Sequence, residues 1–141
     1  MANKNETAAP LPKGGVDDRD ILEVALDLSS NRGEETAAYR IDELSPLVTF
    51  AILTSAASVK RAESIAEHAE ESLEAHGYKV GHIEGRHGSA WILVDAGSVV
   101  VHVFTREERE RIKLDEIYVN CPQTRIGEGD LKAYLAGVRG E

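Results

Sequence analysis

The sequence has a single cysteine, Cys121, among its 141 residues. One thiol excludes a disulfide within the chain and a zinc site built from several thiolates. No run of 18 apolar residues occurs, so the sequence predicts no membrane-spanning helix. The first fifteen residues also lack the apolar segment of a secretory signal. These absences predict a cytoplasmic protein.

Basic residues are scarce relative to acidic ones, with 16 Lys and Arg against 25 Asp and Glu and a net charge of −9. A protein that binds nucleic acid by neutralising phosphates needs clustered Lys and Arg. The charge balance therefore argues against direct nucleic-acid binding. An acidic domain is suited instead to a basic protein partner, including one that belongs to a nucleoprotein particle.

The length corresponds to about one domain. Residues 1–15 are rich in Ala, Pro, Gly and Asn without periodicity, which predicts a disordered N-terminal arm. Residues 16–120 are predicted to form a single α/β domain. Residues 121–141 lose the pattern and are interpreted as a C-terminal tail that can hold a short helix over 130–137.

Periodicity and turn residues outline the secondary structure of the domain. The sequence predicts helices from Asp17 or Asp18 to about Ser30, over 58–76 and within 105–118, and strands over 36–41, 47–54, 78–84, 91–95 and 99–104. The last two strands are joined by Ala96-Gly97-Ser98, a connection typical of a hairpin. The expected fold is a mixed five-stranded sheet flanked by helices.

Two patterns resemble metal sites by composition. His82 and Glu84 share one strand face and His87 follows in a glycine loop, but no zinc spacing is matched. The favoured interpretation is a solvent-facing pair, and no metal site is predicted.

Nucleotidyltransferases place a Gly-Ser turn before two acidic ligands of a metal ion. This chain has Gly97-Ser98 and the Asp18-Arg-Asp20 triplet, but in the reverse order. We therefore predict no catalytic residue and no cofactor. An enzyme that uses other carboxylates is left open as an alternative.

Trp91 is the only tryptophan, and strand alternation places it on one face with Leu93 and Asp95. Tryptophan at such a position either packs in the core or anchors a protein interface. On the next strand, His102 shares a face with Phe104 and is interpreted as a hydrogen-bonded structural residue.

The segment WILVDAGSVVVHVF, residues 91–104, resembles the W-V-L-L-D-Y-G-D-V-V-V-H-V-F segment of the ribosomal silencing factor family, also called Iojap-related proteins. The resemblance spans about 36–118. Its other parts are Ile83-Glu84-Gly85, which is similar to the family's V-E-G, and Glu107, Arg109, Glu110, Leu114 and Asp115, which are similar to its E-x-R-E-x-x-x-L-E stretch. The chain departs from the family pattern at Thr49, Ala96, Ser98 and Tyr118, among other positions.

The resemblance implies a nucleotidyltransferase-like fold without the catalytic motif, and a protein that is not an enzyme. It implies binding to the large ribosomal subunit through ribosomal protein L-fourteen, which blocks association with the small subunit and represses translation. The ribosome-binding residues are then expected to be Trp91, Leu93, Asp95, Ala96, Gly97 and Ser98. A paralogue that binds another basic protein is the second alternative, and a homodimer of the free protein is left open.

Overall fold

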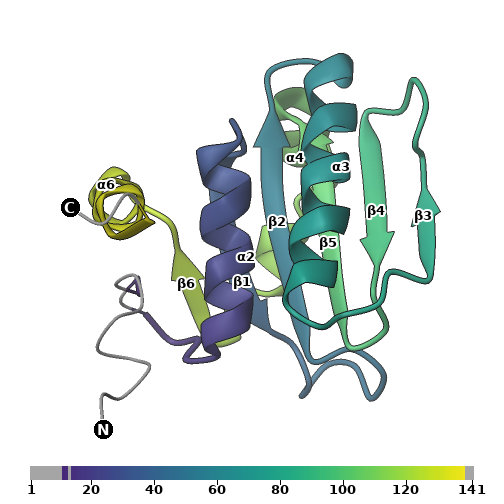
Figure 1. The fold of residues 1–141 in the computed structure, drawn as a ribbon. Helices are drawn as coiled ribbons and strands as arrows, with labels where there is room; N and C mark the ends of the chain where they lie inside the picture. The colour runs from purple at the N-terminus through teal and green to yellow at the C-terminus, as the bar shows by residue number, and fades with distance from the viewer. Residues whose placement is uncertain (1–10, 13, 139–141) are drawn as a thin grey trace, which may run out of the picture.

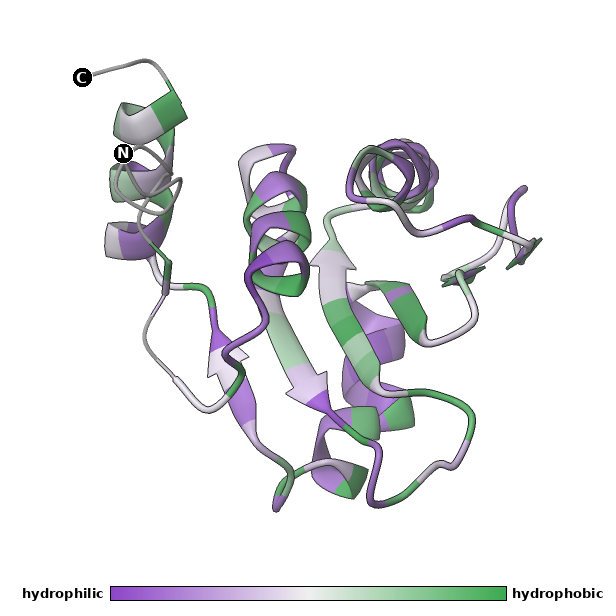
Figure 2. Ribbon diagram, turned by 60° about the horizontal axis from the view of Figure 1, so that its bottom comes forward, coloured by the Kyte–Doolittle hydropathy of each residue, from purple (hydrophilic) through white to green (hydrophobic). Residues whose placement is uncertain are grey.

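The computed structural model describes residues 11–12 and 14–138. They form one mixed sheet with the strand order β3-β4-β5-β2-β1-β6, with helices on both sides (Figure 1; Figure 2). In chain order the elements are α2 (Arg19–Ser30), β1 (Glu34–Arg40), β2 (Phe50–Ala56), α3 (Val59–Ala75), β3 (His82–Glu84), β4 (Trp91–Asp95), β5 (Val99–Thr105), α4 (Arg106–Ile112), α5 (Leu114–Ile117), β6 (Gln123–Arg125) and α6 (Glu128–Val138).

The two central strands, β2 and β5, run parallel, with Phe50 opposite Val99 and Ala56 opposite Thr105. Every residue of both strands is buried, as expected for apolar strands that are covered on both faces. The remaining neighbours in the sheet pair antiparallel, including the predicted hairpin of β4 and β5.

Helices α2 and α3 lie side by side across one face of the sheet and run in opposite directions (Figure 1). Helix α2 begins after Asp18, whose carboxylate accepts a hydrogen bond from the Ile21 N–H at 3.1 Å. Helix α3 begins after Ser58 and ends before Gly77, which has the positive φ of 89° that the sequence pattern predicts there. Both long helices are confirmed.

The predicted five-stranded sheet is wrong in number, because β6 adds a sixth strand that pairs with β1. This strand lies in the segment interpreted as a tail, so the sheet continues beyond residue 120, and α6 follows it. Strand β6 has the sequence QTR, in which only Thr124 is buried. A three-residue edge strand with one buried position has no apolar run to mark it. Strand β3 is also shorter than the predicted 78–84.

The predicted N-terminal arm lies largely outside the described residues, which leave out 1–10 and 13. At its end, the Gly15 N–H donates to the Gln123 carbonyl at 2.9 Å, and the Val16 N–H donates to Thr124 Oγ1 at 3.0 Å. Residues 15 and 16 are thus attached to β6. Among the described residues, no helix has the length and apolar character needed to cross a membrane.

Candidate functional site

The two faces of the sheet are covered to different extents. On the face under α2 and α3, Ile92 and Val94 of β4 are fully buried. On the opposite face, side chains from α4, α5 and the residues after them pack over the middle strands. Trp91, Leu93 and Asp95 of β4 are only half-buried there, as the alternation predicts. The β4 end of this face therefore presents partly accessible apolar side chains, whereas every residue of β2 and β5 is buried.

Trp91 is held in place by two rings of β5. Its indole Nε1–H donates to Nδ1 of His102 at 3.1 Å, and its ring centroid lies 5.2 Å from that of Phe104. His102 is itself stacked on Phe104, with ring planes 7° apart. Burial lowers the pKa of His102 to about 4, so the imidazole is neutral near pH 7. Its Nδ1 can therefore accept the hydrogen bond from the indole N–H. His102 is hydrogen-bonded, as the sequence analysis expected.

Strand β3 supplies a charged border to this surface. Its residues His82 and Glu84 lie opposite Asp95 and Leu93 of β4, and opposed residues of an antiparallel pair share a face. His82 Nε2 lies 3.3 Å from Glu84 Oε1, and their side chains are 61% and 63% exposed. The interpretation of this pair as solvent-facing is confirmed. We call the surface of Trp91, Leu93, Asp95, His82 and Glu84 the open face.

The turn between β4 and β5 closes one end of the open face. Asp95 Oδ1 accepts a hydrogen bond from the Gly97 N–H at 2.9 Å, and Gly97 has a φ of 80°, which favours glycine. The Ser98 carbonyl accepts from the N–H groups of Thr49 and Phe50. Ala96 is buried with the core under α2 and α3, so its methyl group is not on the open face.

Sequence reasoning missed an exposed apolar residue near this turn. The sequence predicts a strand over 47–54, but Leu47 is 82% exposed in the structure. The strand begins only at Phe50, and Val48 packs against the core on the side of the open face. Pro46 was the available sequence signal that the chain enters the sheet late. In the structure, the hydrogen bonds from Thr49 and Phe50 to Ser98 mark that entry.

A charged cavity of about 680 Å³ lies near the carboxyl ends of β2 and β5, with Arg109 and Asp115 in its wall. Arg109 donates to both carboxylate oxygens of Asp115, at 3.0 and 2.9 Å, to the Glu35 carbonyl at 2.6 Å and to Ser55 Oγ at 3.1 Å. Burial acts to raise the pKa of Asp115, but the hydrogen bonds from Arg109 and Tyr39 outweigh it and lower the pKa. The Arg109–Asp115 pair therefore ties α4 and α5 to the sheet.

The chain matches the family model described as "Ribosomal silencing factor during starvation" over residues 17–137. The chain belongs to this family. It is 28% identical over 112 residues to Ribosomal silencing factor RsfS of Bacillus subtilis, covering 79% of this chain and 95% of the relative. It is 25% identical over 109 residues to the RsfS of Halalkalibacterium halodurans, covering 77% and 93%.

Two crystal structures share the fold. A protein of Chromobacterium violaceum superposes with a TM-score of 0.67 at 24% identity, covering 74% of this chain and 88% of the other. A protein of Bacillus halodurans gives 0.62 at 23% identity, covering 78% and 99%. The family resemblance read from residues 91–104 is thus confirmed, with identities typical of a divergent member.

Proposed function

We propose that this ribosomal silencing factor binds the large ribosomal subunit through ribosomal protein L-fourteen and prevents the small subunit from joining. The contact surface is the open face together with Gly97 and Ser98 of the turn. The observation that carries the proposal is the half-buried Trp91, held against β5 on a face that the helices of the described chain leave accessible. The family membership supports a role at the ribosome.

Trp91 has the properties of an interface anchor. Tryptophan is enriched among residues that dominate binding energies, and a rigid ring loses little conformational entropy when it is buried by a partner. The hydrogen bond to His102 and the contact with Phe104 provide that rigidity. Leu93 extends the apolar area beside the indole on the same face.

Charge favours a protein partner over RNA. Glu84 and Asp95 of the open face are acidic, and the chain as a whole carries a net charge of −9. An acidic border attracts a basic ribosomal protein and is repelled by the phosphates of ribosomal RNA. The charge would therefore direct the factor to a protein surface of the large subunit.

The proposed mechanism is steric and needs no chemical step. A domain bound to the joining surface of the large subunit occupies space that the small subunit requires, so joining decreases as occupancy rises. We place the sheet in a nucleotidyltransferase-like fold that has lost its catalytic motif. Strand β5, VVVHVFT, offers no carboxylate after the Gly97-Ser98 turn to hold a metal ion. In this proposal, the protein is a cytoplasmic regulator and not an enzyme.

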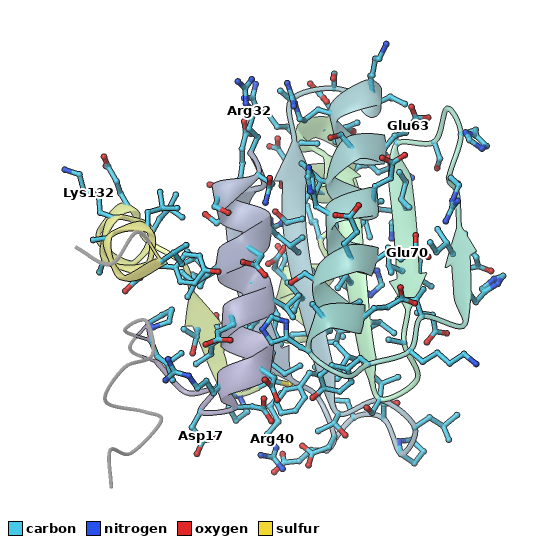
Figure 3. The ribbon with its side chains drawn as sticks, viewed as in Figure 1. Asp17, Arg32, Arg40, Glu63, Glu70 and Lys132 are labelled. Atoms are coloured by element: carbon cyan, nitrogen blue, oxygen red, sulfur yellow. The ribbon has the colours of Figure 1, made fainter. Side chains whose placement is uncertain are left out.

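The test is sedimentation of the purified protein with separated ribosomal subunits. Wild type is expected to co-migrate with the large subunit and to reduce the formation of joined ribosomes. Trp91→Ala should lose both effects while keeping the wild-type circular dichroism spectrum. Glu70→Ala is the matched control, because Glu70 lies on α3, on the opposite side of the sheet (Figure 3).

Three results would overturn the proposal. Co-migration of a folded Trp91→Ala variant as strong as wild type would exclude the open face as the contact. Absence of any wild-type co-migration, combined with a thermal shift on adding nucleotide and Mg²⁺, would point to an enzyme. Absence of both, with capture of a different basic protein, would indicate a paralogue with another partner.

A further inference from the structure

A second group of ligand-type side chains lies on the helix side of the sheet, where the start of α2 meets the end of α3 (Figure 1). Asp20 and Glu23 are in the first turns of α2, and His76 is the C-cap of α3. One ligand atom from each of the three side chains lies within 4.8 Å of the other two. His76 Nε2 and Glu23 Oε2 are 2.9 Å apart. Asp17, labelled in Figure 3, marks this end of α2.

Two of the three ligand groups are oriented by partners outside the group. His76 Nδ1 lies 2.8 Å from the Ser72 carbonyl oxygen, which can only accept, so Nδ1 carries a hydrogen and Nε2 faces the carboxylates. Glu23 Oε1 accepts a hydrogen bond from Arg19 Nε at 3.1 Å, which leaves Oε2 toward His76. Metal-binding histidines and carboxylates are characteristically supported in this way.

The electrostatic surroundings favour a positive charge at Nε2 of His76. The carboxyl end of a helix carries partial negative charge, and His76 caps the 17-residue α3. The Glu23 carboxylate lies directly against this nitrogen, with Oε2 2.9 Å from Nε2. A helix carboxyl end and a carboxylate at this position also favour a metal ion bound to the neutral ring. Asp20 is exposed, so the group is reachable from solvent.

We propose that Asp20, Glu23 and His76 form a binding site for a divalent transition-metal ion of the zinc type. An imidazole nitrogen with two carboxylate oxygens suits Zn²⁺ and related ions better than Mg²⁺ or Ca²⁺, which prefer oxygen ligands alone. Three protein ligands leave a fourth position for water. When the ion binds, the proton between His76 Nε2 and Glu23 Oε2 leaves for the solvent, and each atom donates a lone pair to the ion.

The site would connect α2 to the end of α3 and thereby stabilise the layer that covers the sheet. It is separate from the open face, because α2 and α3 cover the other side of the sheet. Sequence spacing could not reveal it, since His76 and Glu23 are 53 positions apart. Loss of the metal site and loss of ribosome binding are therefore distinguishable in single variants.

The experiment is a calorimetric titration of the full chain with ZnCl₂, repeated in buffers of different ionisation enthalpy to count released protons. One Zn²⁺ per chain is expected, with proton release and an increase in thermal midpoint. His76→Gln and Asp20→Asn should weaken binding at least tenfold and reduce the thermal effect of zinc. His82→Gln is the matched control, because His82 forms the other histidine–carboxylate pair of the described chain and is exposed.

The proposal is overturned if wild type binds no zinc at one equivalent. It is also overturned if His82→Gln abolishes binding while His76→Gln retains it. A His76→Gln variant that unfolds more easily, in a protein whose stability zinc does not change, would show that the three residues form an ion-pair cluster only. Circular dichroism of each variant checks that a loss of zinc binding is not caused by unfolding.

Discussion

The indole of Trp91 and the imidazole of His102 are joined by a hydrogen bond of 3.1 Å between neighbouring antiparallel strands. His102 lies directly opposite Leu93, so Trp91 is its diagonal neighbour on the same face. Because Trp91 is the only tryptophan of the chain, tryptophan fluorescence reports on the surroundings of this one indole. The pair links the buried middle of the sheet to the surface proposed to bind the ribosome.

Replacing His102 by leucine should remove the hydrogen bond to the indole, while the leucine side chain still fills the space of the imidazole. His102→Leu removes the acceptor of the Trp91 N–H, and the expected loss of stability is about 1 kcal/mol. The Trp91 emission should change, and binding to the large subunit should weaken because the ring loses its fixed orientation. His102→Gln, which keeps an acceptor, serves as the control. Equal emission and equal binding in all three proteins would show that the hydrogen bond does not position the ring.

Acid should destabilise the protein through His102. The folded pKa is about 4, below the ordinary 6.5, so between these values the unfolded chain binds more protons than the folded one. The stability contributed by this residue is complete above pH 6.5 and decreases as the pH falls, by about 2 kcal/mol at pH 5 and about 3 kcal/mol below pH 4. Protonation of Nδ1 also breaks the bond to Trp91.

Urea unfolding of wild type and His102→Gln at several pH values measures this contribution. The glutamine does not titrate, so the difference between the two free energies of unfolding isolates the histidine from the acidic groups of the chain. Wild type should lose stability relative to the variant between neutral pH and pH 5. Parallel pH profiles for the two proteins would contradict the expectation.

Local patterns in the sequence were enough to predict the parts of the fold that bury regular apolar stripes. The helices α2 and α3 and the alternation of Trp91 and Leu93 against Ile92 and Val94 follow from period and capping alone. Strand β6 could not be predicted in the same way. Its pairing with β1 is long-range, and its sequence QTR buries one polar residue, Thr124.

The candidate site was also predictable only in part, because local patterns assign faces of a strand but not its neighbours. Strand alternation assigned Trp91 and Leu93 to one face, but the register between strands decides which neighbours they have. The partner of the Trp91 N–H and the place of Glu84 beside Leu93 therefore required the structure. Ala96 was expected among the ribosome-binding residues, yet its side chain packs inside the core.

The Arg109–Asp115 pair should be a major source of stability. Arg109 is 8% exposed, and Arg109→Met leaves the Asp115 carboxylate, the Glu35 carbonyl and Ser55 without this donor. Breaking a buried pair of this kind costs about 3–5 kcal/mol. Arg111→Met is the control, because its pair with Glu108 is at the surface and should contribute much less to stability. Chemical denaturation that gives both variants the same stability would refute the structural role of Arg109.

Within the described residues, helix α6 has one side-chain hydrogen bond to another helix or strand. The Tyr134 hydroxyl donates to the Asp27 carboxylate on α2, and no residue of α6 is fully buried. Tyr134→Phe should cost about 1 kcal/mol or less globally, yet loosen α6 selectively, because local opening is governed by local contacts. Hydrogen exchange of residues 128–138 should accelerate while that of β2 and β5 is unchanged. Lys132→Ala, an exposed change on the same helix, should have no such effect (Figure 3). Unchanged protection of α6 in Tyr134→Phe would mean that apolar contacts with α2 hold the helix in place.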